Sequence, residues 1–313
     1  MNTDIPEQRI DLDDLTSLHV TGSDATKFLH AQFTNDLANL QQNAWQYSGY
    51  CTAKGRLLSF MIIARTGDND YLLILPVEIS EGIMSRLRMF VMRDDVTLTP
   101  QDKDWHITGI IGTSDELRAS NLVIADNTGE LSITDNAYLL TLDSKTGRYL
   151  YLASRDKTDP LQLPPAERKE WSRLDILNGI PAVYAATQEA FVPQMVNLDL
   201  IGAVNFKKGC YPGQEVVARV HYLGKIKQRM FIATTKSKME TKPGDKVFIA
   251  GKPESPAGTL VQSAETNSGL LLQVVLKNTA VEENADFRLG SAEGDKLQIT
   301  EQPYPVLEND RPD

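Results

Sequence analysis

The sequence predicts a protein of the α+β class, with two ferredoxin-like modules followed by a small β-barrel. Three observations carry this prediction. Between residues 18 and 99, apolar segments follow the order strand, helix, strand, strand, helix, strand, which is the order of a split βαβ module. A similar alternation continues to about residue 180. Beyond residue 227, short strand-like segments separated by Gly, Pro, Asn and Ser are typical of a small barrel or sandwich.

The first module can be followed element by element. Leu18 begins a short strand that ends at Gly22, and Ser23 or Asp24 can cap the helix that comes next. The apolar residues of that helix fall on one face, as expected for an amphipathic helix. We expect further strands near residues 45–50 and at 57–64, 71–75 and 96–99, and a second amphipathic helix at 79–91.

The later elements are predicted in the same way. In the second module we expect strands at 106–111, 138–142 and 149–153, a short helix at 115–119, and a helix opened by Pro164 and Pro165 that carries Trp171, Leu174 and Leu177 on its apolar stripe. In the C-terminal part we expect strands at 230–234, 246–250, 259–263, 270–276 and 287–289. We therefore divide the chain into 1–227, made of modules 1–100 and 101–227, and a β-barrel domain at 228–313.

Composition limits the class of protein. The chain has 313 residues, of which 41% are hydrophobic and 24% charged, as in globular proteins. No run of 18 apolar residues predicts a membrane span, and the N-terminus lacks the basic and apolar regions of a signal peptide. Two cysteines cannot form a disulfide framework, so a reducing cytoplasm is the expected compartment. We expect a monomer that does not associate with membranes.

The net charge of −10 argues against broad electrostatic attachment to nucleic acid, so direct tRNA binding is not expected. Residues 207–229 depart from this average. They contain six Lys and Arg residues, with Glu215 as the only acid. Such a segment suits a small anionic ligand, although Lys225 and Lys227 taken alone are equally consistent with a solvated turn.

The residues around Cys210 carry the strongest chemical signal in the chain. Residues 207–219 read Lys-Lys-Gly-Cys-Tyr-Pro-Gly-Gln-Glu-Val-Val-Ala-Arg. Flanking glycines permit tight turns and close approach of a ligand, and nearby cations favour a thiolate. Free cysteines are most often small core residues, but the flanking sequence does not have the composition of a core. We therefore interpret Cys210 as a functional thiol presented by a constrained loop.

Other candidate residues have weaker signals. Cys51 precedes a predicted buried strand and is interpreted as a buried structural cysteine. Lys54-Gly55-Arg56 could meet a carboxylate or phosphate, but such a turn is common. Trp171 lies on a helical stripe and is more often a core residue than a platform for a ligand, although an aromatic face can stack on a flat heterocycle. Two cysteines and four scattered histidines show no metal-ligand spacing, so no metal site is expected.

The segment from Lys208 to Arg219 resembles the signature of the bacterial folate-binding, tRNA-modifying YgfZ family, which is related to the aminomethyltransferase (T-protein) of the glycine cleavage system. The resemblance covers most of the chain. It extends to segments that read Gln-Phe-Thr-Asn-Asp, Cys-Thr-Ala-Lys-Gly-Arg, Trp-Ser-Arg-Leu-Asp-Ile-Leu-Asn-Gly-Ile-Pro and Phe-Val-Pro-Gln-Met, at residues 32–36, 51–56, 171–181 and 191–195.

The resemblance implies the aminomethyltransferase folate-binding fold, with domains arranged in a ring around an opening that binds tetrahydrofolate. It also implies a role in maintaining iron–sulfur enzymes, including a tRNA methylthiotransferase as an indirect client. Carried over by position, Cys210 and Lys208 are the functional residues. The residues implied to contact folate are Trp171, Lys208, Gly209, Cys210, Tyr211, Gln214, Glu215 and Arg219.

Two positions depart from the family pattern. A second aromatic residue that contacts folate in the family would fall near Leu15. The T-protein has a run ending in two aspartates that assist one-carbon transfer, and here the corresponding run ends in Ser59 and Phe60. Neither side chain can take the role of a carboxylate in proton transfer. We therefore expect that ordinary aminomethyl transfer has been lost.

These observations lead to one main hypothesis and two alternatives. The main hypothesis is a folate-binding accessory protein that supports iron–sulfur enzymes and tRNA methylthiolation, without an ordinary catalytic activity. The first alternative is a folate-dependent one-carbon transferase acting on tRNA or another acceptor. The second is a direct tRNA-binding module, which would use Lys225, Lys227 and Arg229.

Overall fold

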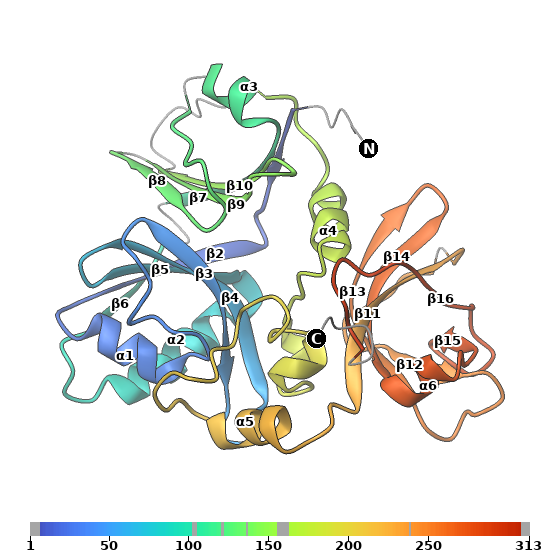
Figure 1. Ribbon diagram of the computed structural model, residues 1–313. Coiled ribbons are helices and arrows are strands. Elements are labelled where there is room, and N and C mark those ends of the chain that lie inside the picture. Colours follow the sequence, from blue (N-terminus) through green and yellow to red (C-terminus); the bar gives the residue numbers. More distant parts are fainter. Residues whose placement is uncertain are drawn as a thin grey trace. The chain divides into compact units, whose positions relative to one another are not determined.

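A computed structural model describes residues 7–101, 105–119, 122–135, 137–154, 163–237 and 239–307. The chain groups into two compact units, and Figure 1 shows the ribbon coloured along the sequence. Unit 1 comprises Met1–Ser48 and Met61–Trp171, and unit 2 comprises Gly49–Phe60 and Ser172–Asp313. Within the described ranges the strands form three sheets. The domain division expected at residues 227 and 228 stays a prediction; the last sheet begins at Gln228.

The first sheet has the connectivity of a ferredoxin-like module. Its strand order is β3-β4-β5-β2-β6, and the pairs β4–β5, β5–β2 and β2–β6 are antiparallel. Helices α1 and α2 contact the central strands β2 and β5 (Figure 1). The elements are β2 (Leu15–Thr21), α1 (Ala25–Gln32), β3 (Ala44–Cys51), β4 (Leu57–Gly67), β5 (Asp70–Pro76), α2 (Val77–Val91) and β6 (Thr97–Pro100). The predicted module is confirmed, with β3 as the extra strand at the edge beside β4.

Burial explains why this module could be recognised from its sequence. Residues 71–75 of β5 are all buried. A strand that is buried on both faces has a continuous apolar run instead of an alternating one. In α2, Ile79, Ile83 and Leu87 are buried at intervals of four residues, which is the period of one helical face.

The second sheet has the order β1-β7-β10-β9-β8. Its elements are β1 (Gln8–Asp11), β7 (Trp105–Ile111), α3 (Ser114–Ala119), β8 (Leu131–Thr134), β9 (Ala137–Asp143) and β10 (Arg148–Ser154). Residues 144–147 join β9 to β10, and this connection is long enough only for an antiparallel hairpin. Because β9 and β10 form a hairpin, they are neighbours in the second sheet, and its strand order differs from that of the first. The N-terminal strand β1 adds an edge strand beside β7.

Helix α4 (Arg168–Leu177) begins later than expected from the two prolines. Instead of opening the helix, Pro164 accepts a hydrogen bond at its carbonyl from the Arg9 N–H (2.9 Å), and Pro165 bridges to Arg9. Trp171 is buried as the pattern predicted. Leu177, which was expected on the apolar stripe, is 42% exposed.

The third sheet belongs to unit 2 and is drawn in orange to red in Figure 1. Its order is β15-β12-β13-β14-β11-β16, and every neighbouring pair is antiparallel. The strands are β11 (Gln228–Thr235), β12 (Lys246–Ile249), β13 (Gly258–Thr266), β14 (Gly269–Lys277), β15 (Phe287–Leu289) and β16 (Gln298–Ile299), with helix α6 (Asn278–Glu282) after β14. The five expected strands are present, and β16 and α6 are additional. A core that includes Phe231, Leu272 and Phe287 holds this part together.

The lengths and apolar content of the described helices bear on whether the chain could span a bilayer. None of those in the described ranges combines the length and apolar character needed to cross a membrane.

Candidate functional site

The thiol loop, residues 205–213, presents Cys210 at the surface of unit 2. Cys210 and Gly209 are exposed, whereas Lys208 and Tyr211 on either side are buried. Gln214, the first residue of α5 (Gln214–Tyr222), directs its Nε2 group toward the carbonyl oxygens of Lys208 (3.3 Å) and Gly209 (3.4 Å). The buried neighbours and these bonds fix the loop, so the sulfur atom is accessible on a constrained backbone.

Two glycine turns meet beneath this loop. Gly213 precedes α5 with φ +83°, and a Cβ atom there would lie 2.4 Å from the Thr52 carbonyl oxygen and 2.6 Å from the Gly55 Cα. Gly55 has φ +71°, and its own Cβ would lie 3.0 Å from the Val216 Cβ. Only glycine accommodates both the left-handed backbone and this approach. The Lys-Gly-Arg turn and the cysteine motif, which are far apart in the sequence, are therefore in direct backbone contact.

A third segment supports the same loop and helix. The carbonyl of Phe191 accepts a hydrogen bond from the Leu57 N–H (2.8 Å), next to the Lys-Gly-Arg turn. Arg56 in that turn donates through Nη1 to the carbonyl of Ala190 (3.0 Å). Residues 190–191 therefore anchor the turn. The three sequence motifs at 51–56, 191–195 and 208–219 thus come together in unit 2.

The base of the site contains a buried polar network. The side chain of Gln194 is fully buried and donates through Nε2 to the carbonyl of Val217 in α5 (2.7 Å). The Gln194 carbonyl accepts a hydrogen bond from Arg229 Nη1 (2.8 Å). Arg229 also makes two bonds to the Asp199 carboxylate, at 2.5 and 2.9 Å, and the two side chains are only 1% and 6% exposed. Arg229 is therefore a structural residue, and the inclusion of Arg229 in a tRNA-binding surface was wrong.

Three buried side chains, those of Lys208, Tyr211 and Cys51, belong to the thiol loop and the turn that contacts it. The Nζ atom of Lys208 lies 5.0 Å from the centroid of the Tyr211 ring, within the range of a cation–π interaction. The Tyr211 hydroxyl has no hydrogen-bond partner among the described residues, and burial, together with the nearby Cys51, raises the pKa of Tyr211. Burial also raises the pKa of the Cys51 thiol, so this cysteine stays neutral and inaccessible, as its interpretation as a structural cysteine requires.

Trp171 is buried in unit 1 and packs against neighbouring residues. It is 3% exposed, and the guanidinium carbon of Arg148 lies 4.6 Å from the ring centroid. The ring also lies against the backbone of Gly109, where a Cβ atom would fall 2.4 Å from its Cε3 atom. A folate contact by Trp171 stays a prediction. The other residues predicted to contact folate, Glu215 and Arg219, are exposed on α5.

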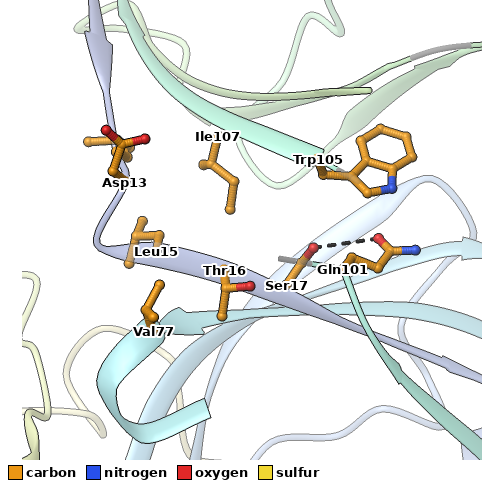
Figure 2. Close-up of a pocket in the computed structure, with 9 residues that line it drawn as sticks. Asp13, Leu15, Thr16, Ser17, Val77, Gln101, Trp105 and Ile107 are labelled. Carbon is orange, nitrogen blue, oxygen red and sulfur yellow. Dashed lines mark hydrogen bonds between the residues drawn. The ribbon is translucent and has the colours of Figure 1, made fainter. Parts of the chain in front are cut away.

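Unit 1 contains a cavity of about 180 Å³ between β2 and β7 (Figure 2). Leu15 and Thr16 of β2 line one side, and Trp105 and Ile107 of β7 line the other. The remaining lining residues are Leu12, Asp13, Ser17, Val77 and Gln101. The resemblance places an aromatic residue of the family near Leu15, and here Trp105 provides an aromatic side chain in the same cavity as Leu15. No motif marks Trp105 in the sequence, so its place in the cavity could not be predicted from the sequence alone.

The polar groups of this cavity are only partly satisfied. Thr16 is 5% exposed, and its Oγ1 has no hydrogen-bond partner within the described part of the chain. The Ser17 hydroxyl lies 3.5 Å from the Gln101 Oε1 atom, a long hydrogen bond (Figure 2). A buried hydroxyl without a partner is costly unless water or a ligand pairs with it. The donor set is not that of a metal site, and no three His, Cys, Asp or Glu side chains in the described ranges are placed to hold a metal ion.

Comparison with known proteins defines the class of fold first. The structure resembles the glycine cleavage system aminomethyltransferase T from Bartonella henselae with a TM-score of 0.74 at 12% identity, over 97% of this chain and 87% of that chain. The GCVT N-terminal domain model matches residues 8–130. The fold is therefore that of aminomethyltransferase T, as predicted.

Relatives in sequence then define the family. The tRNA-modifying protein YgfZ of Photorhabdus laumondii is 30% identical over 97% of this chain and 94% of the relative. The protein of the same name from Blochmanniella pennsylvanica is 26% identical over 91% of this chain and 91% of the relative. The one from Escherichia coli is 26% identical over 97% of this chain and 95% of the relative. The chain belongs to the YgfZ family, which confirms the resemblance of the cysteine motif.

Proposed function

We propose that this protein is a folate-binding accessory protein that supports tRNA methylthiolation by helping to maintain iron–sulfur enzymes in the cytoplasm. The observation that carries the proposal is the exposed Cys210 on a loop fixed by close backbone packing, in a chain of the YgfZ family. Relatives in this family are named as tRNA-modifying proteins. The constrained loop supports a role for the thiol itself, because a purely structural cysteine would be buried.

The accessory role, as opposed to one-carbon transfer, is supported by Ser59 and Phe60. Both residues are buried in β4, with exposed fractions of 0% and 7%. The Ser59 hydroxyl donates to the carbonyl of Phe60 at 3.4 Å and so is engaged with the backbone. General acid–base assistance requires a titratable group within hydrogen-bonding reach of the reacting atom. Neither side chain provides one where the resemblance places the aspartates of the T-protein.

Folate binding is supported by the cavity of unit 1. Its volume is below the 300–1,000 Å³ or so that is typical of complete ligand sites, so it suits one ring system with the remainder of the ligand outside. In this proposal Trp105 offers an aromatic surface, and Thr16 and Gln101 offer hydrogen-bonding groups to the ring. When bound, a reduced folate supplies reducing or one-carbon chemistry. Trp171 and exposed residues of the cysteine motif are proposed as further contacts, as the family resemblance implies.

The role of Cys210 can be tested by complementation. A strain that lacks the gene should show reduced methylthiolation of its tRNA, measured by mass spectrometry of digested nucleosides. Wild-type protein should restore the modification, and Cys210→Ala at equal abundance should not. A matched control is Ser291→Ala, which alters an exposed side chain in unit 2 and should restore it fully. Full restoration by Cys210→Ala would remove the proposed role of the thiol.

Folate binding is tested by titrating the purified protein with tetrahydrofolate while tryptophan fluorescence is recorded. Single replacements by Phe at Trp105 and Trp171 should each weaken binding. Trp45→Phe is the control, because Trp45 is a buried residue whose Nε1 is bonded to the carbonyl of Thr141 (3.1 Å). If the wild-type protein does not bind, or if only Trp45→Phe weakens binding, the folate proposal fails.

The two functions are separated by turnover. Purified protein is incubated with a reduced folate that carries a one-carbon unit and with candidate acceptors, including tRNA. The accessory role predicts that the one-carbon folate is not consumed. Consumption that depends on the acceptor would favour the transferase.

A further inference from the structure

A cluster of aromatic side chains lies on the surface at the end of α5. The rings of Phe206 and His221 are stacked, with centroids 3.7 Å apart and planes inclined by 9°. Tyr222 meets both rings edge-on, at 6.2 Å and 4.7 Å, and is itself 61% exposed. The following residue, Leu223, is 86% exposed. Soluble proteins usually bury rings of this size, so an exposed and mutually ordered group indicates a binding surface.

Three exposed lysines lie close to these rings in the sequence. Lys207 follows Phe206 directly, and Lys225 and Lys227 follow the end of the helix. All three are exposed, and none forms an ion pair with any residue in the described ranges. Asn278 holds the segment that contains Lys225 and Lys227. Its Nδ2 donates a hydrogen bond to the carbonyl of Ile226 (2.8 Å), and its backbone N–H donates to the carbonyl of Lys227 (2.9 Å). We call Phe206, Lys207, His221, Tyr222, Lys225 and Lys227 the aromatic–basic patch.

We propose that the aromatic–basic patch binds a single-stranded segment of RNA. Aromatic rings beside unpaired cations match the two features of a single-stranded nucleic acid, flat bases and a chain of phosphates. In this proposal the stacked rings offer a surface for one base, and the three lysines offer positive charge to the adjacent phosphates. The net charge of −10 opposes broad attachment to nucleic acid but not a contact of this size.

This proposal goes beyond the functions of the thiol and the folate site. It requires neither folate nor Cys210, and only the choice of RNA over DNA rests on the proposed role in tRNA modification. An aliphatic protein partner would leave the three lysines without counter-charges. A membrane surface would leave the ordered rings without a planar partner. The membrane surface is included as an outcome of the test.

The test uses the full-length protein and a fluorescently labelled single-stranded oligoribonucleotide, with anisotropy as the readout at about 50 mM to 200 mM salt. The logarithm of the association constant is plotted against the logarithm of the salt concentration. Each phosphate contact to a single strand contributes about −0.7 to the slope of this plot, so three contacts predict a slope of about −2. Replacing Lys225 and Lys227 together by Gln should reduce the slope by about 1.4. Replacing His221 and Tyr222 together by Ala should weaken binding roughly fivefold to a hundredfold with the slope unchanged.

Matched controls separate this surface from general effects. Phe90→Ala removes a partly exposed ring on α2, and Lys252→Gln removes an exposed lysine in unit 2, so both should bind as the wild type does. Circular dichroism confirms that each variant is folded. The proposal is overturned if the wild type does not bind at the lowest salt, if the patch variants bind as the wild type does, or if duplex RNA or anionic vesicles bind as strongly as the single strand.

Discussion

Replacing Gly213 by Ala should disrupt the thiol loop more severely than replacing another glycine with the same backbone conformation. A left-handed conformation costs a residue with a side chain about 1–2 kcal/mol. The added methyl group would also lie 2.4 Å from the Thr52 carbonyl oxygen, against backbone that cannot rotate away. Overpacking of this kind costs about 1–3 kcal/mol. The expected destabilisation of the site is therefore about 2–5 kcal/mol.

The buried thiol of Cys51 provides the assay, because it is next to Thr52 and can be labelled only when this region opens. In a Cys210→Ser background, the labelling rate of Cys51 by a thiol reagent measures the free energy of opening. Gly213→Ala should accelerate labelling roughly 30-fold to several thousandfold, at about 1.4 kcal/mol for each factor of ten. The control is Gly251→Ala in the same unit, with φ +72° and no atom within 4 Å of the added methyl group. It carries only the backbone cost, so acceleration is at most about 30-fold.

The comparison of the two variants decides the outcome. If Gly213→Ala is labelled no faster than Gly251→Ala, the turns do not meet as described. The assignment of Gly213 as the residue that fixes the loop would then be wrong.

Three further predictions concern unit 2. In the wild type, one thiol should react rapidly with the reagent, and Cys210→Ser should abolish that fast phase while Cys51 stays slow; a fast phase that survives would contradict the described burial. Arg229→Met should lower the free energy of unfolding by about 3–5 kcal/mol in a urea titration, because it leaves the buried Asp199 unpaired. Adding Asp199→Leu to this variant should recover part of that loss. Equal stability of the single and the double variant would contradict this reasoning. Burial raises the pKa of Tyr304 to about 12 from the usual value near 10. The stabilisation that comes with this shift is present below pH 10 and is lost as the pH rises from about 10 to 12. Tyr304→Phe should therefore lose less free energy of unfolding over that range, and identical losses in the two proteins would refute the pKa assigned to Tyr304.

The elements of the first module could be predicted because each long segment has a strong periodic signal. The buried run at 71–75 and the apolar stripe of α2 record in the sequence which faces are covered. Three of the short strands carry no such signal. Strands β1, β8 and β16 contain four, four and two residues, and they are strands because neighbouring edges pair with them. Their pairing is a tertiary effect, which local propensity cannot reveal.

The residue types of the candidate site were evident from the sequence, but their environments were not. The glycines, the cysteine and the charged residues around position 210 indicated a constrained and exposed thiol, and that thiol is exposed. The sequence placed Arg229 among the surface cations, whereas the fold buries it against Asp199. It singled out Trp171 and passed over Trp105, although Trp105 is the tryptophan that lines the cavity with Leu15.

By itself, the sequence determined the periodicity of the major elements, the family and the chemistry available at each position. Only the tertiary structure decided which distant segments touch, and so which charges are paired and which side chains are accessible. The meeting of Gly55 with Gly213 shows why. Backbone conformation is partly a local property of residue type, whereas contact across more than 150 positions depends on how the whole chain packs.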